Sequence, residues 1–407
     1  MIDTIKKARQ TSKTLLELNP QTKKNVILDM SEEISKSKKN ILSANKIDMQ
    51  NAISLSKAMQ DRLMLDEKRI NDIANSLKIV ANLQDPIGNV LSGWINYAGL
   101  KINKVSIPIG VIGIIYESRP NVTAEVASLC LKSSNVCLLK GGKEALNSNL
   151  SIIKALHKSL EKFNIPTECI SYLNISRQDV KKFLKMDKYI DLIIPRGGEN
   201  LVKMVSNTSK IPVIKHDKGL CHAYVDEFAD LKKALDICVN AKFSKPSACN
   251  SIETILIHKN IADKFLPMLK TKFDELKIHI KGCNQTAKFI NCEKATNKDF
   301  DTEYLDYAVN LKVVSSIDEA ITHIEKFSSS HSEVIISKNE ENIQKFLNLI
   351  DSACVYVNAS TRFSDGGEFG FGAEIGISTN KLHARGPMGL NELTTYKYQV
   401  LGNGQVR

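Results

Sequence analysis

The chain is poor in aromatic residues and has no long apolar segment. Of its 407 residues only 6% are aromatic, with a single tryptophan. No stretch approaches the roughly 18 apolar residues that a membrane-spanning helix needs. The first residues mix acidic and basic side chains and contain no apolar core of a signal peptide. We therefore expect a cytoplasmic protein with no membrane partner.

The sequence also lacks the cysteine spacings of a disulfide framework or a structural zinc site. Its nine cysteines are odd in number, and no two of them are separated by two residues. Cys283 and Cys292 form a conceivable pair of ligands, but no second pair follows at ligand spacing. These features predict reduced thiols and no bound metal.

Lysine and arginine exceed the acidic residues, which gives a formal net charge of +11. No helix-turn-helix, zinc finger or aromatic RNA-binding motif accompanies this charge, and aromatic residues are too few for stacking platforms. The lysines are spread along expected helices, which is typical of solvated faces, so we expect no nucleic-acid partner. A positive field favours anionic small molecules, although a lysine-rich genome would produce the same composition.

The apolar pattern changes twice along the chain. Residues 1–90 show helical spacing throughout, and 91–108 have the alternation and the Gly-containing turn of a β-hairpin. From residue 111 apolar strands alternate with helices, which predicts a parallel sheet with right-handed crossovers. The expected strands are 111–116, 136–140, 169–173 and 189–195, and the expected helices include 123–132 and 199–206. A second α/β block begins near residue 226, and 394–401 again have strand character.

The most informative stretch is Lys245–Thr254, in which Cys249 lies in a small polar turn directly before an apolar strand. A thiol at the mouth of a strand is accessible to a substrate, and cysteine attacks as the thiolate. A buried, inert cysteine is the alternative. His216 and His222 lie nearby in the sequence and could form a Cys–His dyad, but the sequence does not place either ring beside the thiol.

Two Gly-Gly turns, 141–142 and 197–198, each follow an expected strand and precede a helix. Neither completes a G-x-G-x-x-G motif, and no P-loop is present. Such turns let backbone N–H groups approach an anion at a helix N-terminus, and Lys140 and Lys143 add positive charge at the first of them. Plain tight turns are the alternative interpretation.

Asn121 lies between the first buried strand and its helix, in the stretch Arg119–Thr123. An amide at this position either caps the helix or points toward the ligand cleft at the carboxyl edge of the sheet. In the second case it could donate to a developing oxyanion.

Taken together, these segments resemble the aldehyde dehydrogenase superfamily over nearly the whole chain. The stretches that carry the resemblance are Ile107–Thr123, Leu139–Glu144, Ile193–Gly198, Cys221–Asp226, Lys245–Thr254, Asn358–Gly370 and Leu382–Leu390. The resemblance implies an aldehyde dehydrogenase-like α/β fold with three parts. These are a Rossmann-type NADP-binding domain (1–90 and 109–225), a catalytic domain (226–390) and an oligomerisation hairpin with its C-terminal strand (91–108 and 391–407). It also implies a homodimer or homotetramer.

The resemblance further implies roles for individual residues. Cys249 matches the nucleophile, and Asn121 matches the amide that forms the oxyanion hole with the Cys249 backbone N–H. Lys140 matches the lysine at the adenosine end of NADP(H), and Glu303 matches the glutamate that holds the nicotinamide ribose. Gly197 and Gly198 match the helix start beside the dinucleotide phosphates.

Within the superfamily, the stretches are most similar to the enzymes that reduce γ-glutamyl phosphate to glutamate 5-semialdehyde with NADPH, the second step of proline biosynthesis from glutamate. That similarity implies a functional link with glutamate 5-kinase. The oxidising members carry a glutamate that activates water, whereas the matching region here, 214–219, has none. A thioester at Cys249 would then exchange with phosphate rather than be hydrolysed. A CoA-acylating aldehyde dehydrogenase shares this departure and is the alternative.

The amino and carboxylate groups of such a substrate need polar partners. We expect Arg362 to bind the carboxylate, because a guanidinium pairs with a carboxylate through two parallel hydrogen bonds. Arg119 and Arg385 are further candidates, and any of the three could instead form a structural ion pair.

Overall fold

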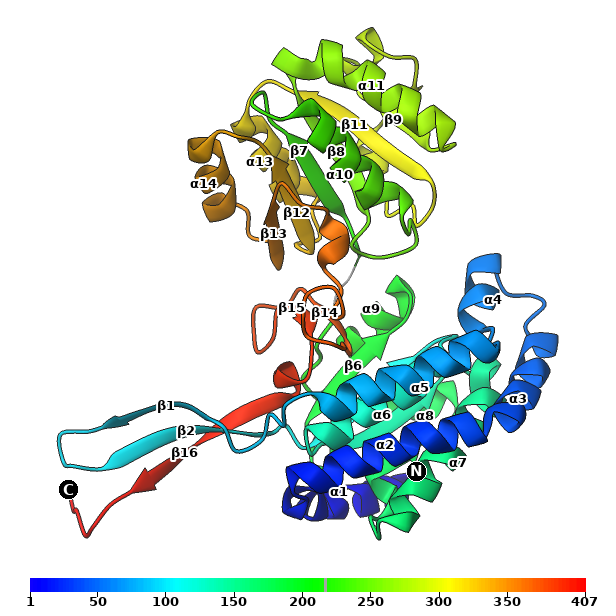
Figure 1. Ribbon diagram of the computed structural model, residues 1–407, viewed down its shortest axis with the longest axis vertical. Helices are drawn as coiled ribbons and strands as arrows, with labels where there is room; N and C mark the ends of the chain where they lie inside the picture. The colour runs from blue at the N-terminus through cyan, green and yellow to red at the C-terminus, as the bar shows by residue number, and fades with distance from the viewer. Residues whose placement is uncertain (216–217) are drawn as a thin grey trace. The chain divides into compact units, whose positions relative to one another are not determined.

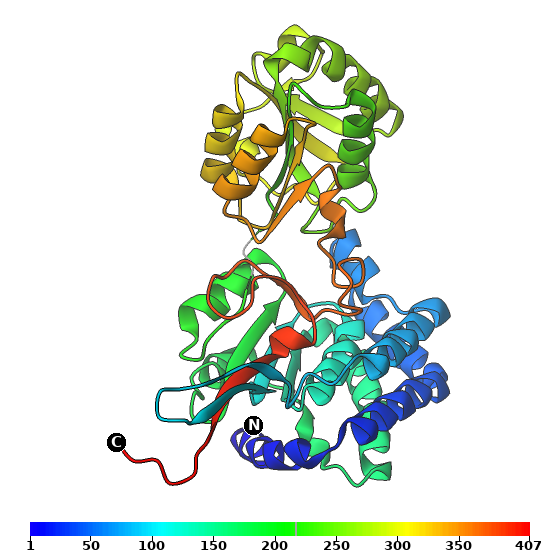
Figure 2. The same ribbon diagram turned by 60° about the vertical axis from the view of Figure 1, so that its left-hand side comes forward.

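The computed structural model describes residues 1–215 and 218–407, which divide into two compact units (Figure 1, Figure 2). Unit 1 comprises Met1–Lys215, Gly370–Gly376 and Met388–Arg407, and unit 2 comprises the described residues of His216–Phe369 together with Ile377–Pro387. The chain therefore passes from unit 1 to unit 2 twice, after residues 215 and 376, and returns to unit 1 each time.

Unit 1 begins with the helices that the sequence predicts. They are α1 (Ile2–Glu17), α2 (Pro20–Lys36), α3 (Lys38–Asn51), α4 (Lys57–Leu63) and α5 (Glu67–Asn82). At the start of α2 the Asn19 side chain accepts a hydrogen bond of 2.8 Å from the Thr22 N–H, and Pro20 occupies the first helical position. The apolar residues at helical spacing in α2 and α5 are buried, and these two helices pack side by side (Figure 1).

A four-stranded parallel sheet forms the centre of unit 1. Its strands are β3 (Val111–Tyr116), β4 (Val136–Gly141), β5 (Ile170–Tyr172) and β6 (Leu192–Arg196), and its helices are α6 (Pro120–Lys132), α7 (Leu146–Lys162), α8 (Arg177–Phe183) and α9 (Glu199–Thr208). The strand order β5-β4-β3-β6 reverses direction between β3 and β6. Ligands bind in open α/β sheets at this kind of switch point, beyond the carboxyl ends of the strands.

Two boundaries in this sheet differ from the prediction. Helix α6 begins at Pro120 rather than at residue 123, because proline is tolerated in the first turn, where its missing N–H costs nothing. Strand β6 begins at Leu192 rather than at 189, because Tyr189 and Ile190 close a turn by donating to the Met186 carbonyl.

A separate three-stranded antiparallel sheet extends from unit 1. Strands β1 (Val90–Ile95) and β2 (Lys101–Pro108) form the predicted hairpin, and β16 (Thr394–Leu401) pairs with β2 along its whole length. The C-terminal strand therefore completes a sheet that begins 300 residues earlier in the sequence (Figure 1).

Unit 2 contains a seven-stranded parallel sheet with the order β10-β9-β11-β8-β7-β12-β13. Its strands are β7 (Cys221–Val225), β8 (Ile252–His258), β9 (His279–Gly282), β10 (Glu293–Lys294), β11 (Ala308–Val314), β12 (Ser332–Ile336) and β13 (Cys354–Val357). Its helices are α10 (Leu231–Phe243), α11 (Ala262–Glu275), α12 (Asn297–Phe300), α13 (Ile317–Phe327) and α14 (Glu340–Leu349). Helices α10 and α11 pack in one apolar core, and α13 and α14 pack in another.

The observed units differ from the predicted domain boundaries at the start of unit 2 and in the last part of the chain. Strand β7 hydrogen-bonds to β8 and β12, which places the start of unit 2 before β7 rather than after residue 225. Residues 370–376 and 388–390 group with unit 1, although the prediction assigned them to the catalytic domain. Two short strands, β14 (Gly376–Ser378) and β15 (Gly386–Met388), pair in this last part of the chain.

Three further observations concern the described residues. No helix in the described ranges has the length and apolar content needed to cross a bilayer. All nine cysteines lie within the described residues and are free thiols, as predicted. No cluster of three or more His, Cys, Asp or Glu side chains with metal-binding geometry occurs in 1–215 or 218–407.

Candidate active site

Cys249 lies in a tight turn at the amino end of β8 and is half-buried, so its thiol is not enclosed in the core. The turn is closed by two backbone hydrogen bonds, from Ala248 N–H to the Lys245 carbonyl at 3.1 Å and from Ser251 N–H to the Ala248 carbonyl at 3.0 Å. A reactive thiol needs at least partial exposure, and the role of Cys249 as the nucleophile stays a prediction.

The backbone of Cys249 packs directly against Gly219, which precedes β7. A Cβ added at Gly219 would lie 2.1 Å from the Cys249 carbonyl oxygen and 2.6 Å from its Cα, so only glycine fits. The Gly219 N–H donates to Glu303 Oε1 at 3.0 Å. Cys249 and Glu303 are 54 residues apart in the sequence, and both contact Gly219 in the structure.

Asn250, the residue after Cys249, is hydrogen-bonded to the segment that contains Thr361, Arg362 and Ser364. The Asn250 side chain donates to the Ser364 carbonyl at 2.9 Å and accepts a hydrogen bond from Arg362 Nη1. Arg362 Nε donates to Ser244 Oγ at 3.1 Å, and Thr361 Oγ1 donates to the Asn250 carbonyl at 2.6 Å. Arg362 therefore lies beside the Cys249 turn and helps to fix it, and its role in binding substrate stays a prediction.

A buried ion pair lies beneath the turn. Lys242 Nζ and Glu253 Oε2 are 2.7 Å apart, and both side chains are almost fully buried. Burial raises the pKa of Glu253 to about 8, although the charge and hydrogen bond of Lys242 act in the opposite direction. Lys242 lies in the last turn of α10 and Glu253 is the second residue of β8, so this pair joins the two elements that flank the cysteine turn.

His331, a histidine that the sequence did not suggest, lies close to a residue that contacts the Cys249 turn. The Cys221 thiol donates to the Cys249 carbonyl at 3.3 Å and lies 3.7 Å from His331 Nδ1. His222 instead contacts Glu333, with 3.1 Å between its Nδ1 and Oε2, so its ring is committed to a buried carboxylate. His216 lies outside the described residues. Only the pairing of β7 with β12 brings His331 here, which sequence spacing does not reveal.

In unit 1, Asn121 is the second residue of α6 and does not cap it. Its Nδ2 donates to Glu125 Oε2 at 3.1 Å, one helical turn further on. Burial raises the pKa of Glu125, while the Asn121 hydrogen bond and the charges of Arg196 and Arg119 oppose that rise. The sequence analysis missed Glu125, although the i, i+4 spacing from Asn121 was a usable signal.

Lys140 lies near the carboxyl end of β4, and its Nζ donates to the Gly141 carbonyl at 2.6 Å. Burial lowers the pKa of Lys140, and the charges of Glu144 and Glu117 oppose this effect. Glu144 accepts hydrogen bonds from the Ser118 N–H at 2.7 Å and from Ser118 Oγ at 2.9 Å. The first Gly-Gly turn is therefore surrounded by ionisable groups.

The second Gly-Gly turn forms the start of α9, and a side-chain carboxylate of the chain binds there. The Gly198 N–H donates to Glu117 Oε2 at 3.0 Å, and a Cβ at Gly197 would lie 2.4 Å from the same oxygen. A carboxylate of the chain itself thus shows that this helix start accepts a negative oxygen. That observation fits the predicted phosphate contact of Gly197 and Gly198.

The two remaining arginine candidates have different surroundings. Arg385 forms an ion pair with Asp351, with 2.7 Å between Nη1 and Oδ1, and donates from Nη2 to the Asp351 carbonyl at 2.8 Å. These contacts favour the structural alternative for Arg385. Arg119 directly precedes α6, and its charge acts on Glu125, next to Asn121.

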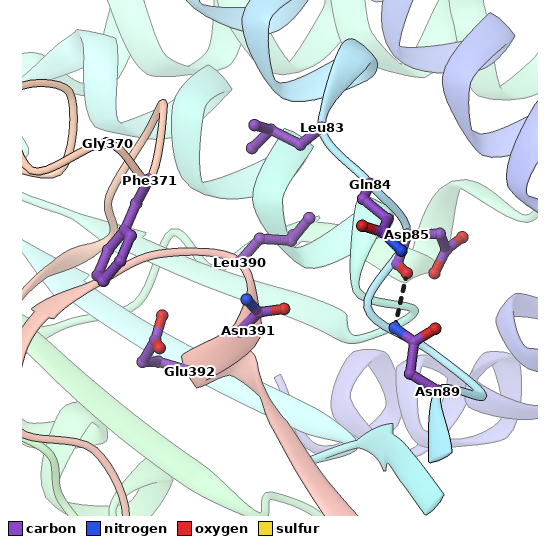
Figure 3. A pocket seen from close by; sticks show the side chains of 9 residues that line it. All are labelled: Leu83, Gln84, Asp85, Asn89, Gly370, Phe371, Leu390, Asn391 and Glu392. Carbon is purple, nitrogen blue, oxygen red and sulfur yellow. Dashed lines mark hydrogen bonds between the residues drawn. The ribbon is translucent and has the colours of Figure 1, made fainter. Parts of the chain in front are cut away.

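A cavity of about 350 Å³ lies elsewhere in unit 1 (Figure 3). It is lined by Leu83, Gln84, Asp85, Asn89, Gly370, Phe371, Leu390, Asn391 and Glu392. Asn89 closes one side by donating from Nδ2 to the Asp85 carbonyl at 3.1 Å. No predicted site residue lines this cavity.

Each unit therefore gathers one set of predicted residues. Asn121, Lys140, Gly197 and Gly198 lie at or just beyond the carboxyl ends of β3, β4 and β6. In unit 2, Gly219 lies two residues before β7 and Cys249 three residues before β8, so both lie near the amino ends of these strands. Comparisons with known proteins identify the family of the chain. The sequence profile of the aldehyde dehydrogenase family matches residues 1–289, and the chain belongs to that family.

Relatives over the full length define the relationship more closely. The chain is 54% identical to a gamma-glutamyl phosphate reductase from Aliarcobacter butzleri, with all of both chains covered. The crystal structure of a gamma-glutamyl phosphate reductase from Thermotoga maritima has 44% identity and a TM-score of 0.97, over 100% of this chain and 99% of that one. An acetylating aldehyde dehydrogenase from Geobacillus thermoglucosidasius shares the fold at 15% identity, with a TM-score of 0.70 over 100% and 97% of the two chains.

Proposed function

We propose that this protein reduces L-γ-glutamyl 5-phosphate to L-glutamate 5-semialdehyde and phosphate, the second step of proline biosynthesis from glutamate. The observation that carries the proposal is the half-buried Cys249, held in a turn between Gly219 and Asn250, in a chain similar over its full length to gamma-glutamyl phosphate reductases. The reaction belongs in the cytoplasm, where its thiol stays reduced.

Cys249 is the nucleophile in this proposal. Its thiolate attacks the acyl carbon, the bond to the phosphate oxygen breaks, and a thioester forms. Asn121 Nδ2 and the Cys249 backbone N–H stabilise the oxyanion of the tetrahedral intermediate. Glu125 supports this role because its carboxylate occupies one Nδ2 hydrogen, which fixes the orientation of the amide and leaves the second hydrogen for the substrate.

Members of this family use a nicotinamide cofactor, which supplies the hydride that reduces the thioester. We propose NADP(H) as that cofactor. Lys140 would lie at its adenosine end, and Gly197 and Gly198 would lie beside its phosphates, at the helix start where the Gly198 N–H now donates to the Glu117 carboxylate. Glu303 would hold the nicotinamide ribose, and Lys143, beside the first Gly-Gly turn, adds a positive charge suited to a 2′-phosphate.

The remaining substrate contact is assigned to Arg362. Its guanidinium lies at the Cys249 turn, and a fork of parallel N–H donors suits the α-carboxylate. Arg119 is a second candidate because it lies next to Asn121.

We also propose that the three-stranded sheet mediates a homodimer or homotetramer. Strand β1 and its turn expose the apolar side chains Val90, Leu91, Trp94, Ile95 and Tyr97, and β16 exposes Tyr396, Tyr398, Val400 and Leu401. Strands β1 and β16 are both edges, and apolar edge strands are usually covered by a partner. The molar mass from light scattering tests this assignment.

The function is tested by phosphate-dependent reduction of NADP with glutamate 5-semialdehyde, with NAD and CoA as competing conditions. We expect turnover with NADP and phosphate, essentially none in Cys249→Ala, and a loss of about 10²–10³-fold in Asn121→Ala. Turnover that requires CoA instead of phosphate would identify a CoA-acylating enzyme. Near-native turnover in Cys249→Ala would eliminate the assigned nucleophile.

A further inference from the structure

Arg196 is a half-buried arginine to which the proposed function gives no role. It ends β6 at the carboxyl edge of the four-stranded sheet, directly before the Gly-Gly turn of α9. In the register of the sheet it lies opposite Tyr116, the last residue of β3, from which the chain continues to Asn121. Arg196 therefore occupies the switch point of this sheet, where ligands bind.

The guanidinium of Arg196 makes no hydrogen bond or ion pair with any side chain or backbone group in 1–215 or 218–407. Its Nε is buried and lacks an acceptor. A buried donor without a partner is costly, and more so when it is charged. The side chain therefore has donors available for an acceptor that the chain itself does not provide.

The backbone of Gly376 holds this side chain in place. A Cβ at Gly376 would lie 2.7 Å from Arg196 Nη1 and 3.1 Å from its Cζ, and φ at this residue is +153°. Both the space and the backbone conformation require glycine. The returning segment 370–376 of unit 1 thus provides a close-fitting wall for the guanidinium.

Arg196 and the predicted oxyanion-hole residue Asn121 both interact with Glu125. Its positive charge acts on the Glu125 carboxylate, which accepts the hydrogen bond from Asn121. The distance between Arg196 and Glu125 is nevertheless too long for an ion pair. An anion that bound Arg196 would therefore lie near the amide that receives the acyl oxygen.

We propose that Arg196 binds the phosphate group of the acyl phosphate substrate and, in the reverse direction, inorganic phosphate. This inference rests on the proposed function. The phosphate is bonded through one oxygen to the carbon whose oxyanion Asn121 receives, whereas three carbons separate that carbon from the α-carboxylate. When the acyl carbon–oxygen bond breaks, the electron pair stays on oxygen and the phosphate gains one negative charge. A planar guanidinium fork stabilises that charge through two parallel hydrogen bonds.

Arg196→Gln and Arg196→Lys test the assignment, with Arg177→Gln as the control because Arg177 is an exposed arginine of the same unit. Each variant is assayed by NADP reduction with the semialdehyde at varied phosphate, and NADPH affinity is measured by fluorescence titration without turnover. We expect Arg196→Gln to raise the KM for phosphate roughly 10- to 150-fold, from the loss of charged hydrogen bonds. Arg196→Lys should recover part of this loss, and the semialdehyde KM, NADPH affinity and control variant should stay within two-fold of wild type.

Three results overturn the inference while leaving the proposed function intact. Weaker NADPH binding with an unchanged phosphate KM would assign Arg196 to the dinucleotide phosphates. A rise in the semialdehyde KM alone would assign it to the α-carboxylate, and unchanged constants would leave it a structural residue. If Arg196→Gln does not fold, the phosphate KM of Arg196→Lys tests the assignment, because lysine keeps the positive charge but lacks the two parallel N–H donors of the guanidinium. A wild-type protein without phosphate-dependent turnover would overturn both proposals.

Discussion

Replacing Gly219 with alanine is the sharpest test of how the cysteine turn is built. The added methyl carbon would lie 2.1 Å from the Cys249 carbonyl oxygen and 2.6 Å from its Cα, where ordinary contact begins near 3.4 Å. Both are backbone atoms, so no side chain can rotate away. The two segments must separate by about 1 Å, and because φ of Gly219 lies outside the left-handed region, crowding alone is responsible.

A displacement of about 1 Å at a reacting group can reduce the rate about 100-fold. We therefore expect Gly219→Ala to lower kcat by roughly that factor, which corresponds to about 2.7 kcal/mol of activation free energy. Overpacking should also lower the free energy of unfolding by about 1–3 kcal/mol. The Gly219–Glu303 hydrogen bond would lengthen with the same movement, so the KM for the dinucleotide should rise as well.

Two measurements check this prediction, kcat in the phosphate-dependent assay and the rate at which iodoacetamide alkylates Cys249, followed by peptide mass spectrometry. Gly367→Ala is the matched control, because a Cβ there meets only Asp365 Oδ1, at an ordinary 3.4 Å. A folded Gly219→Ala protein whose kcat and alkylation rate stay within three-fold of wild type would refute the reasoning.

Two further predictions concern unit 2. Arg362→Ala should raise the KM for the semialdehyde roughly 10- to 150-fold, through loss of charged hydrogen bonds; an unchanged KM would remove Arg362 as the carboxylate ligand, and slower alkylation of Cys249 would assign it to the turn. Burial, aided by the charges of His222, Lys312 and Lys326, lowers the pKa of His323 to about 2. Below about pH 6.5 the His323 ring binds a proton in the unfolded chain but not in the folded chain. The free energy of unfolding therefore decreases as the pH is lowered, by about 2 kcal/mol at pH 5.0. In urea unfolding, His323→Gln should lose this part of the pH dependence, and an equal slope in both proteins would contradict the burial effect.

Much of the fold was predictable because its elements follow local rules. Helical spacing of apolar residues located α2 and α5, and continuous apolar strands between helices located the parallel sheet of unit 1. The errors lie at element ends. Helix α6 begins three residues early because proline fits the first turn, and β7 belongs to the second sheet because of its hydrogen bonds to β8 and β12.

Prediction of the site was limited by pairing between distant segments. Sequence motifs led to the predictions for Cys249, Asn121 and Lys140, since each belongs to a continuous stretch with a recognisable pattern. Glu125 and Arg196 follow only from side-chain geometry, namely a hydrogen bond within one helix and an unpartnered guanidinium against Gly376. His331 reaches Cys221 only because β12 pairs with β7.

By itself, the sequence determined the kinds of element and their order, and it led to the prediction of Cys249 as the reactive thiol, because these depend on residues close together along the chain. The tertiary structure alone decided which side chains surround that thiol and which donors remain without acceptors. Those properties depend on strand order and on backbone approaches between Gly219 and Cys249 and between Gly376 and Arg196. No local pattern encodes such approaches, because each becomes defined only when separate segments pack together.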